Sequence, residues 1–370
     1  MRIDKLELRT FRNYEEASLE FSEGLNVFVG DNAQGKTNAL EAISLLALGK
    51  SHRTHKDSDF IQWGADGALI IGEVFVRNRL NHLRLAFQKG SKKAQVNGVH
   101  LNKLSDFVGH FQVVLFAPED LQLVKGGPGL RRRFLDMELG QTKPKYLSHL
   151  SQYARVLQQR NTLLKQSNSI DTLLDILDIQ LVEHAVPILQ ERFRFVHEIA
   201  SLSREVYESI SDYKEIFDVR YVTSVKDLLA NGAHQDEIMK RLEHTLSDKR
   251  KTDLQLGYTT TGPHRDDLEF KLNGQSVHAF ASQGQQRTIA LAMRLAEIDF
   301  IRKETGEYPV LLLDDVLSEL DDKRQANLLL SMSQKVQTIL TTATLSHSTE
   351  KLGADRRLFH VRSGIIKKEG

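Results

Sequence analysis

A stretch near the amino terminus has the spacing of a phosphate-binding loop, G-x-x-x-x-G-K-[ST]. It consists of Gly30, Asp31, Asn32, Ala33, Gln34, Gly35, Lys36 and Thr37. Glycines in such a loop let backbone N–H groups turn inward around phosphate oxygens. The lysine supplies a cation for the β and γ phosphates, and the threonine hydroxyl can ligate Mg²⁺. The sequence therefore predicts that this stretch binds ATP together with Mg²⁺.

Two carboxylates follow an apolar run far along the chain. Residues 310–313 read Val-Leu-Leu-Leu, and Asp314 and Asp315 come next, which indicates a buried strand that ends in acids. Open α/β sheets bind ligands beyond the carboxyl ends of their strands. We expect Asp314 to hold Mg²⁺, directly or through water, and Asp315 to orient or deprotonate the attacking water. Adjacent strand residues point to opposite faces, so the two acids should have different roles.

A third motif, Ser-Gln-Gly-Gln-Gln-Arg at residues 282–287, precedes a helix with apolar periodicity. Ser282 and Gln285 have the spacing of a capping box, which is a structural role. The exposed N–H groups of a helix N-terminus can also bind a phosphate. The motif resembles the signature of ATP-binding-cassette ATPases, which contacts ATP held by a partner subunit. On that interpretation Ser282, Gly284 and Gln285 complete a nucleotide site on a second copy of the chain.

The elements that must position these motifs alternate between strands and helices. Strands are expected within residues 1–30, 69–116, 254–260, 268–277, 310–313 and 338–342, and helices within 36–48, 283–303 and 322–331. A glycine-rich break at residues 126–129 precedes a mostly helical stretch, in which Pro187 should start or kink a helix. Trp63 is expected to pack within the fold rather than to stack on bases.

The predicted fold class is α/β: an ATP-binding-cassette type of P-loop ATPase head, with a mixed sheet and N-terminal antiparallel strands. A helical insertion interrupts this head. The expected domains are a discontinuous ATPase domain of residues 1–126 and 252–370, and a helical arm of residues 127–251.

Composition excludes several classes of function. The chain has 370 residues and no cysteine, which excludes disulfides and thiolate zinc sites and fits a reducing cytoplasm. No apolar run approaches the length of a membrane span, and the first residues lack the apolar stretch of a signal peptide. Lys and Arg together number 50 against 49 for Asp and Glu, so a DNA-binding function requires a local patch rather than net charge.

Longer strings along the chain resemble the RecF family of bacterial recombination mediators, which is related to chromosome-maintenance ATPases. These strings are FRNY at residues 11–14, GKTN at 35–38, APEDL at 117–121, RRRFLD at 131–136, GPHRDD at 262–267, SQGQQ at 282–286 and LDDVLSELD at 313–321. They span almost the whole chain, and the separation between Lys36 and Asp314 also resembles the heads of this wider group.

The resemblance implies a cytoplasmic, ATP-dependent DNA-binding protein of replication, recombinational repair and the SOS response. Such proteins form ATP-dependent homodimers, bind single- and double-stranded DNA at gaps and junctions, and help to load recombinase with RecR and RecO partners. Asp315 stands where many cassette ATPases have glutamate, which favours weak, DNA-dependent ATP hydrolysis as a switch. A switch histidine has no clear position in the motif order, and His347 is a candidate.

Alternative interpretations remain open at this stage. A nucleotide-binding subunit of a transporter would carry the same motifs together with a membrane partner. A chromosome-maintenance ATPase would need long coiled-coil arms or a cysteine hook, and the sequence has neither. Residues 131–133 could bind phosphates or form a solvated basic helix start. Residues 262–267 could lie near nucleotide or DNA, or form a turn stabilised by its own charge pairs.

Overall fold

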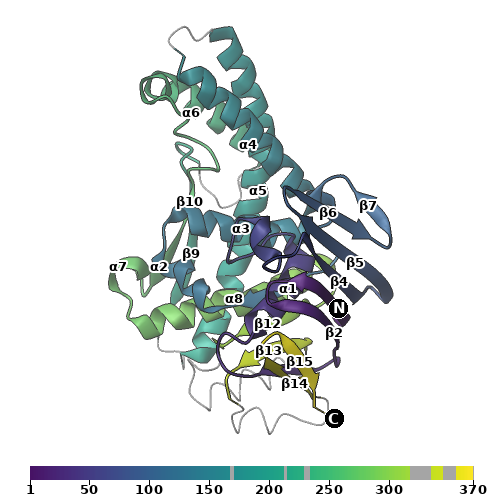
Figure 1. Cartoon of the computed structure of the whole chain (residues 1–370). Coiled ribbons are helices and arrows are strands. Elements are labelled where there is room, and N and C mark those ends of the chain that lie inside the picture. The colour runs from purple at the N-terminus through teal and green to yellow at the C-terminus, as the bar shows by residue number, and fades with distance from the viewer. Residues whose placement is uncertain (167–170, 212–214, 229–233, 317–334, 345–355, 370) are drawn as a thin grey trace. The chain divides into compact units, whose positions relative to one another are not determined.

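The computed structural model describes residues 1–166, 171–211, 215–228, 234–316, 335–344 and 356–369 (Figure 1). The chain forms two compact units, of which unit 1 comprises residues 1–120 and 297–370 and unit 2 comprises residues 121–296. These bounds differ from the expected break points after residues 126 and 251, and the assignment of an ATPase domain to 1–126 and 252–370 remains a prediction.

An antiparallel sheet forms one layer of unit 1. Its strands, in spatial order, are β2 (Tyr14–Glu20), β1 (Arg2–Phe11), β4 (Gly67–Val76), β5 (Arg79–Gln88), β6 (Ser91–Val96) and β7 (Val99–Leu101). The tight turn between β6 and β7 lies at Asn97 and Gly98, both with positive φ, as the Asn-Gly pair predicts. The expectation of N-terminal antiparallel strands is therefore confirmed.

A second, mainly parallel sheet in unit 1 carries the chemical motifs. Its order is β15 (Ile365–Lys368), β14 (Arg356–Arg362), β3 (Leu25–Val29), β13 (Thr338–Thr342), β12 (Val310–Asp314) and β8 (Val113–Phe116). All neighbours pair in parallel except β14 with β15. β12 is buried along its whole length, which is typical of a central parallel strand.

Helix α1 (Lys36–Leu48) directly follows β3 and the phosphate loop. It contacts β4 and β5 of the antiparallel sheet as well as β8, β12 and β13 of the parallel sheet. Because it packs on both sides, nearly all its residues are buried. It ends at Gly49, which adopts a left-handed conformation (φ 63°). The two sheets of unit 1 thus share α1 as a common core element.

Unit 2 is mostly helical. Its helices are α2 (Leu121–Lys125), α3 (Pro128–Thr142), α4 (Pro144–Leu164), α5 (Asp171–Ile210), α6 (Gln235–Leu256), α7 (Val277–Phe280) and α8 (Gln283–Thr305), the last of which continues into unit 1. The long helices α4 and α5 pack along each other (Figure 1). Buried Arg160 on α4 forms ion pairs with Asp178 on α5 and Asp253 on α6, which joins the three helices.

A small antiparallel sheet completes unit 2, with the order β11 (Gln275–Ser276), β10 (Asp267–Leu272) and β9 (Phe217–Val222). The hairpin of β10 and β11 turns at Asn273 and Gly274 as expected. Strand β9 was not expected, because its partner β10 lies far along the chain and the intervening sequence is helical.

Some expectations about individual elements are wrong. Residues 254–260 are not a strand: they form the last turn of α6 and a loop, with Gly257 in a left-handed conformation. The Asp253 carboxylate accepts hydrogen bonds from the Thr260 N–H and hydroxyl, which fold this segment back on the helix end. Pro187 lies inside α5, so of its two expected roles the start of a helix is wrong and a kink remains a prediction. Trp63 is fully exposed on a loop. The helix expected at 322–331 lies outside the described residues.

Within the described parts of the chain, no helix is both long and apolar enough to span a membrane.

Candidate nucleotide-binding site

The predicted phosphate loop connects β3 to α1 and borders a cavity of about 270 Å³ in unit 1. The lining residues are Asn32, Ala33, Gly35, Lys36, Thr37, Asn38, Arg53, Asp314, Asp315 and Thr341. Tertiary structure thus brings the loop and both acids, which are far apart in the sequence, to the edges of one cavity. This edge lies at the carboxyl ends of β3, β12 and β13, where an open α/β sheet binds ligands.

The backbone of the loop needs small residues at specific positions. Gly35 has φ 120°, and a Cβ there would lie 2.6 Å from Nδ2 of Asn13. Ala33 also has a positive φ of 64°. Left-handed residues of this kind are typical of loops whose successive N–H groups turn to one side and bind an anion. The positive end of the α1 dipole lies next to this loop and favours phosphate further.

The ammonium group of Lys36 is held by the loop itself. Nζ donates hydrogen bonds to the carbonyl oxygens of Gly30 at 2.5 Å and Asp31 at 2.8 Å. Lys36 is only 6% exposed, although it lines the cavity. A buried lysine with such partners is pre-oriented, so little side-chain entropy is lost when it meets a phosphate.

Asp314 is fixed by hydroxyl groups from two neighbouring elements. The Thr37 hydroxyl on α1 donates to Oδ1 of Asp314 at 2.9 Å, and the Thr341 hydroxyl on β13 donates to the same oxygen at 2.7 Å. A threonine hydroxyl and a carboxylate are hard oxygen donors of the kind that Mg²⁺ prefers. Thr37 and Asp314 are therefore of the right chemical type to hold Mg²⁺.

Asp315 reaches the same cavity because the strand ends in an unusual backbone conformation. Its φ is 52°, in the left-handed region, and its backbone N–H donates to the Thr341 hydroxyl at 3.0 Å. Simple strand alternation would separate the two acids onto opposite faces, but this bend lets both line one cavity. Strain of this kind, which costs of order 1–3 kcal/mol, is typical of functional sites.

The phosphate loop is also positioned by neighbouring residues that the sequence did not indicate as part of the site. Asn13 Nδ2 donates to the carbonyl oxygen of Gln34 at 2.9 Å, and the Tyr14 hydroxyl donates to that of Gly35 at 2.8 Å. Asn38, on α1, donates to Oδ1 of Asn13 at 2.8 Å. These residues belong to strings quoted only for their family resemblance, and nothing local in the sequence connects residue 13 with residue 34.

A buried carboxylate organises the cations beside the cavity. Glu41 on α1 is fully buried and accepts hydrogen bonds from Arg12 at 2.7 and 2.9 Å. It also accepts one from the Ser51 hydroxyl at 2.6 Å, and Arg53 lies 3.4 Å away. The guanidinium of Arg53, which lines the cavity, donates to Oδ1 of Asn38 at 2.9 Å. Arg53 is thus a cation beside the loop that no motif indicated.

His52 lies near Glu41 and Asp314, but its imidazole is neutral. Burial lowers its pKa, and the charges of Glu119, Glu41, Asp120 and Asp314 oppose this shift without reversing it. Its two ring nitrogens are buried and have no hydrogen-bond partner in the structure.

The Ser-Gln-Gly-Gln turn caps helix α8 in unit 2. The Ser282 N–H donates to Oε1 of Gln285 at 2.7 Å, and the Gln285 N–H donates to the Ser282 hydroxyl at 3.2 Å. The capping box is therefore present. Ser282 and Gly284 are nevertheless exposed, so the capped turn keeps an open surface at a helix N-terminus. Both interpretations of the motif are compatible with this geometry, and a role in binding nucleotide remains a prediction.

Residues of the strings at 131–136 and 262–267 form hydrogen bonds within unit 2. Arg131 is buried and donates to both carboxylate oxygens of Asp267 at 2.6 and 2.8 Å, so a solvated basic helix start does not describe it. The buried Asp266 accepts hydrogen bonds from the hydroxyls of Tyr221 and Ser224, each at 2.7 Å. His264 accepts one from Tyr153, and its Nε2 contacts the Thr259 carbonyl oxygen at 3.1 Å. The acids of the string at 262–267 thus pair with Arg131, Tyr221 and Ser224 rather than with the string's own basic residues. A role of this string near nucleotide or DNA remains a prediction.

Residues 317–321 of the string at 313–321 and the candidate switch histidine His347 lie outside the described residues.

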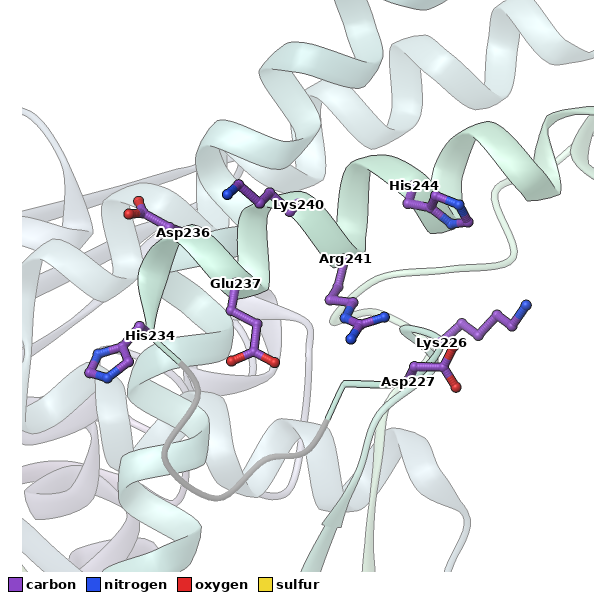
Figure 2. Close-up of a pocket in the computed structure, with 8 residues that line it drawn as sticks. All are labelled: Lys226, Asp227, His234, Asp236, Glu237, Lys240, Arg241 and His244. Carbon is purple, nitrogen blue, oxygen red and sulfur yellow. The ribbon is translucent and has the colours of Figure 1, made fainter.

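A separate cavity of about 600 Å³ lies beside the first half of α6 in unit 2. Its lining residues are Lys226, Asp227, His234, Asp236, Glu237, Lys240, Arg241 and His244. Figure 2 shows Glu237 and Arg241 pointing toward the loop of Lys226 and Asp227, with Asp236 and Lys240 on another side of the helix. Acidic and basic side chains are mixed around this cavity, so its lining does not create the positive potential that would select a phosphate.

The parallel sheet, the glycine loop that opens α1 and the adjacent antiparallel sheet define an ATP-binding-cassette type of ATPase head. The expected fold class is therefore confirmed.

The chain belongs to the RecF/RecN/SMC N-terminal domain family, whose family model matches residues 2–367, and within it to the RecF proteins. A curated relative from Listeria welshimeri, "DNA replication and repair protein RecF", is 47% identical over 372 residues and covers 100% of both chains. A relative of the same name from Oceanobacillus iheyensis is 44% identical, over 99% of this chain and 100% of its own. The resemblance inferred from the sequence strings is thereby confirmed.

Solved structures agree with this relationship. One, described as "the recombination mediator protein RecF-ATPrS in RecFOR pathway", is 32% identical with a TM-score of 0.92 and covers 100% of this chain and 98% of its own. A second, described as "RecF-ATP" in the same pathway, is 33% identical with a TM-score of 0.92 over 100% and 97%. The Smc head domain of Pyrococcus furiosus, at 19% identity and a TM-score of 0.56 over 99% and 95%, shows the shared fold.

Proposed function

We propose that this chain is an ATP-dependent DNA-binding protein of bacterial DNA replication and repair. The observation that carries the proposal is the single cavity in which the glycine loop, Lys36, Thr37, Asp314 and Asp315 meet. Full-length relatives named for DNA replication and repair, and a solved relative described as RecF-ATP, support the same function.

In the proposed site, the loop N–H groups and the Lys36 ammonium bind the β and γ phosphates of ATP. Thr37 and Asp314 would hold Mg²⁺, which when bound neutralises charge on the phosphate oxygens. Asp314 is kept in place for this by the hydroxyls of Thr37 and Thr341. Asp315, at the bent end of β12, orients the attacking water or accepts its proton. Its short side chain favours slow turnover. Hydrolysis in this proposal serves as a switch and depends on DNA.

The proposed active form is a homodimer that ATP holds together. Ser282, Gly284 and Gln285 lie at a helix N-terminus with exposed surface, which suits contact with the γ phosphate on a second copy. In this arrangement each nucleotide is bound by the loop of one protomer and the turn of the other. ATP binding then changes the quaternary structure, and hydrolysis reverses the change.

The proposed ligand of the dimer is gapped or junction DNA, both single- and double-stranded, in the cytoplasm. With Lys and Arg nearly balanced by Asp and Glu, DNA affinity must come from a surface that dimerisation assembles rather than from overall charge. Support for this role comes from the solved relatives placed in the RecFOR pathway. We further propose that the dimer acts with RecR- and RecO-type partners to load recombinase during recombination, and that it supports SOS induction.

Fluorescence anisotropy of a labelled gapped duplex tests this function. We expect tight binding with ATP, much weaker binding without nucleotide, and loss of the ATP effect in Lys36→Ala. The same measurement with lipid vesicles is the control for a transporter subunit. ATP-independent DNA binding, or ATP-dependent binding to vesicles in place of DNA, would contradict the proposal.

A further inference from the structure

The exposed turn at the start of α8 is held by a carboxylate from a distant part of unit 2. Glu215 lies between the end of α5 and strand β9. Its Oε1 accepts a hydrogen bond from Nε2 of Gln285 at 2.6 Å, and its Oε2 accepts one from the Tyr207 hydroxyl at 2.6 Å. One side chain therefore joins Tyr207, near the end of α5, to Gln285 in the turn.

The bond to Glu215 determines which way the Gln285 amide faces. Oε1 of Gln285 accepts from the Ser282 N–H, while Nε2 donates to Glu215. A reversed amide would place its NH₂ against the Ser282 N–H and its oxygen against a carboxylate oxygen, so both contacts would become repulsive. Glu215 thus selects the amide orientation that caps the turn, and the two hydrogen bonds form or break together.

Tyr207, at the α5 end of this connection, is held by packing. Tyr207 is 1% exposed, and its ring packs against that of Phe217, with centroids 5.4 Å apart. Burial, together with the neighbouring Glu215, raises the pKa of the Tyr207 hydroxyl, which therefore remains a donor. Helix α5, which is 40 residues long and ends at Ile210, runs from here along the helical part of unit 2 (Figure 1). A shift of α5 would thus be transmitted to the turn through two short bonds.

We propose that Glu215 is a positioning residue that ties the Ser282–Gln285 turn to helix α5, so that the state of the helical arm controls how the turn meets the nucleotide of a second copy. This inference rests on the proposed function, in which the turn completes a partner's ATP site. Glu215 and Tyr207 lie outside the sequence motifs and form a regulatory contact to the turn.

Glu215→Ala removes both bonds and is the principal test. ATP affinity of the monomer should stay within about twofold of the wild type, because the phosphate loop is unchanged. ATP-dependent dimerisation, measured by mass photometry, should weaken about tenfold, which corresponds to the loss of one charge-assisted hydrogen bond. Glu205→Ala, an exposed carboxylate on α5, is the matched control and should behave like the wild type. Wild-type dimerisation and turnover in Glu215→Ala would overturn the proposal.

The arm side of the link is tested by Tyr207→Phe, which keeps the ring but removes the donor. We expect weaker dimerisation in the same direction, and less than additive loss when it is combined with Glu215→Ala. Ser209→Ala, on the same helix with its hydroxyl bonded to Val206, is the control. Full additivity, or no effect of Tyr207→Phe, would refute the connection to α5.

A mixture of protomers separates positioning of the turn from a general loss of stability. A heterodimer of Glu215→Ala and Lys36→Ala contains one site with an intact loop and an intact turn, and the other site carries both defects. Turnover should reappear in this mixture, although neither variant alone is active at that concentration. A mixture of Ser282→Arg and Lys36→Ala is the reference. If the reference recovers and the Glu215→Ala mixture does not, Glu215 does not act through the turn. If the reference also fails, it is the split site of the proposed function that is wrong.

Discussion

The Thr37 hydroxyl on α1 donates a hydrogen bond to Oδ1 of Asp314 at the end of β12, across a sequence separation of 277 residues. Thr341 donates to the same oxygen from β13. The phosphate loop and the acidic strand are therefore already joined at the atoms that would bind Mg²⁺. A carboxylate held in this way needs little rearrangement to accept the ion.

Thr37→Val should weaken the binding of ATP with Mg²⁺ by about tenfold, since Asp314 loses one partner and the ion loses one ligand. Thr37→Ser keeps the hydroxyl and should stay close to the wild type. Isothermal titration with and without EDTA measures the effect. Equal losses with and without Mg²⁺ would assign Thr37 to phosphate binding alone.

Lys36→Ala should lower ATP affinity by at least about tenfold, because charge-assisted hydrogen bonds to phosphate contribute roughly 1.5–3 kcal/mol each. The two loop carbonyls that Lys36 now binds also lose their donor. Nucleotide titration of the purified monomer, with circular dichroism as the folding control, measures this. Unchanged affinity in a folded variant would end the assignment of the phosphate loop.

Asp315→Asn keeps the shape of the side chain but removes the charge that orients or deprotonates water. Asparagine also tolerates the left-handed backbone that Asp315 adopts, so the local structure should persist. We expect ATP binding to remain and turnover to fall at least about a hundredfold, in keeping with the usual contribution of a general base. ATP-bound dimers should then accumulate. Wild-type hydrolysis would move the catalytic role to another residue.

Ser282→Arg places a bulky cation on the exposed turn, where two copies are proposed to meet. Monomeric ATP binding should survive, because Lys36 and Thr37 lie in the other compact unit. Dimerisation and hydrolysis should be lost, and DNA binding should no longer respond to ATP. Analytical ultracentrifugation with and without ATP follows the dimer. If Ser282→Arg abolishes ATP binding by a folded monomer, the turn acts on its own chain's site.

Stability should fall in mild acid because of His264. Burial lowers its pKa to about 4 from the usual 6.5, and the adjacent Arg265 and Arg132 act in the same direction against the Thr259 carbonyl. The unfolded chain therefore takes up a proton near pH 6.5, whereas the folded chain resists until about pH 4. The contribution to stability is fully present above pH 6.5, falls as the pH drops to about 4, and changes no further below that.

The size of this loss is on the order of 3 kcal/mol for a shift of this kind. Urea unfolding at pH 7.0 and 5.0, an interval that covers roughly 2 kcal/mol of this loss, measures it in the wild type and in His264→Gln, whose amide can keep both contacts. The variant should lose less stability than the wild type over this interval. His244→Gln, at an exposed position on α6, is the control. An identical pH slope in His264→Gln and the wild type would show that His264 is not the titrating group.

Short-range patterns were sufficient for much of the fold. The glycine loop before α1, the apolar β12 with its terminal acids and the Asn-Gly hairpins each depend on neighbouring residues, so their spacing predicts them directly. The error at residues 254–260 and the omission of β9 have the opposite cause. Asp253 and β10 determine those segments through contacts that no local window contains.

The sequence by itself determined to which family the chain belongs and predicted the residues that we propose to bind phosphate, because both depend on contiguous strings. Tertiary structure alone decided how those strings cooperate. Asn13 supports the loop at Gln34, Glu41 gathers Arg12 and Arg53, and Glu215 orients Gln285. Hydrogen bonds of a few ångströms depend on where folding places two atoms, and sequence distance contains no information about that.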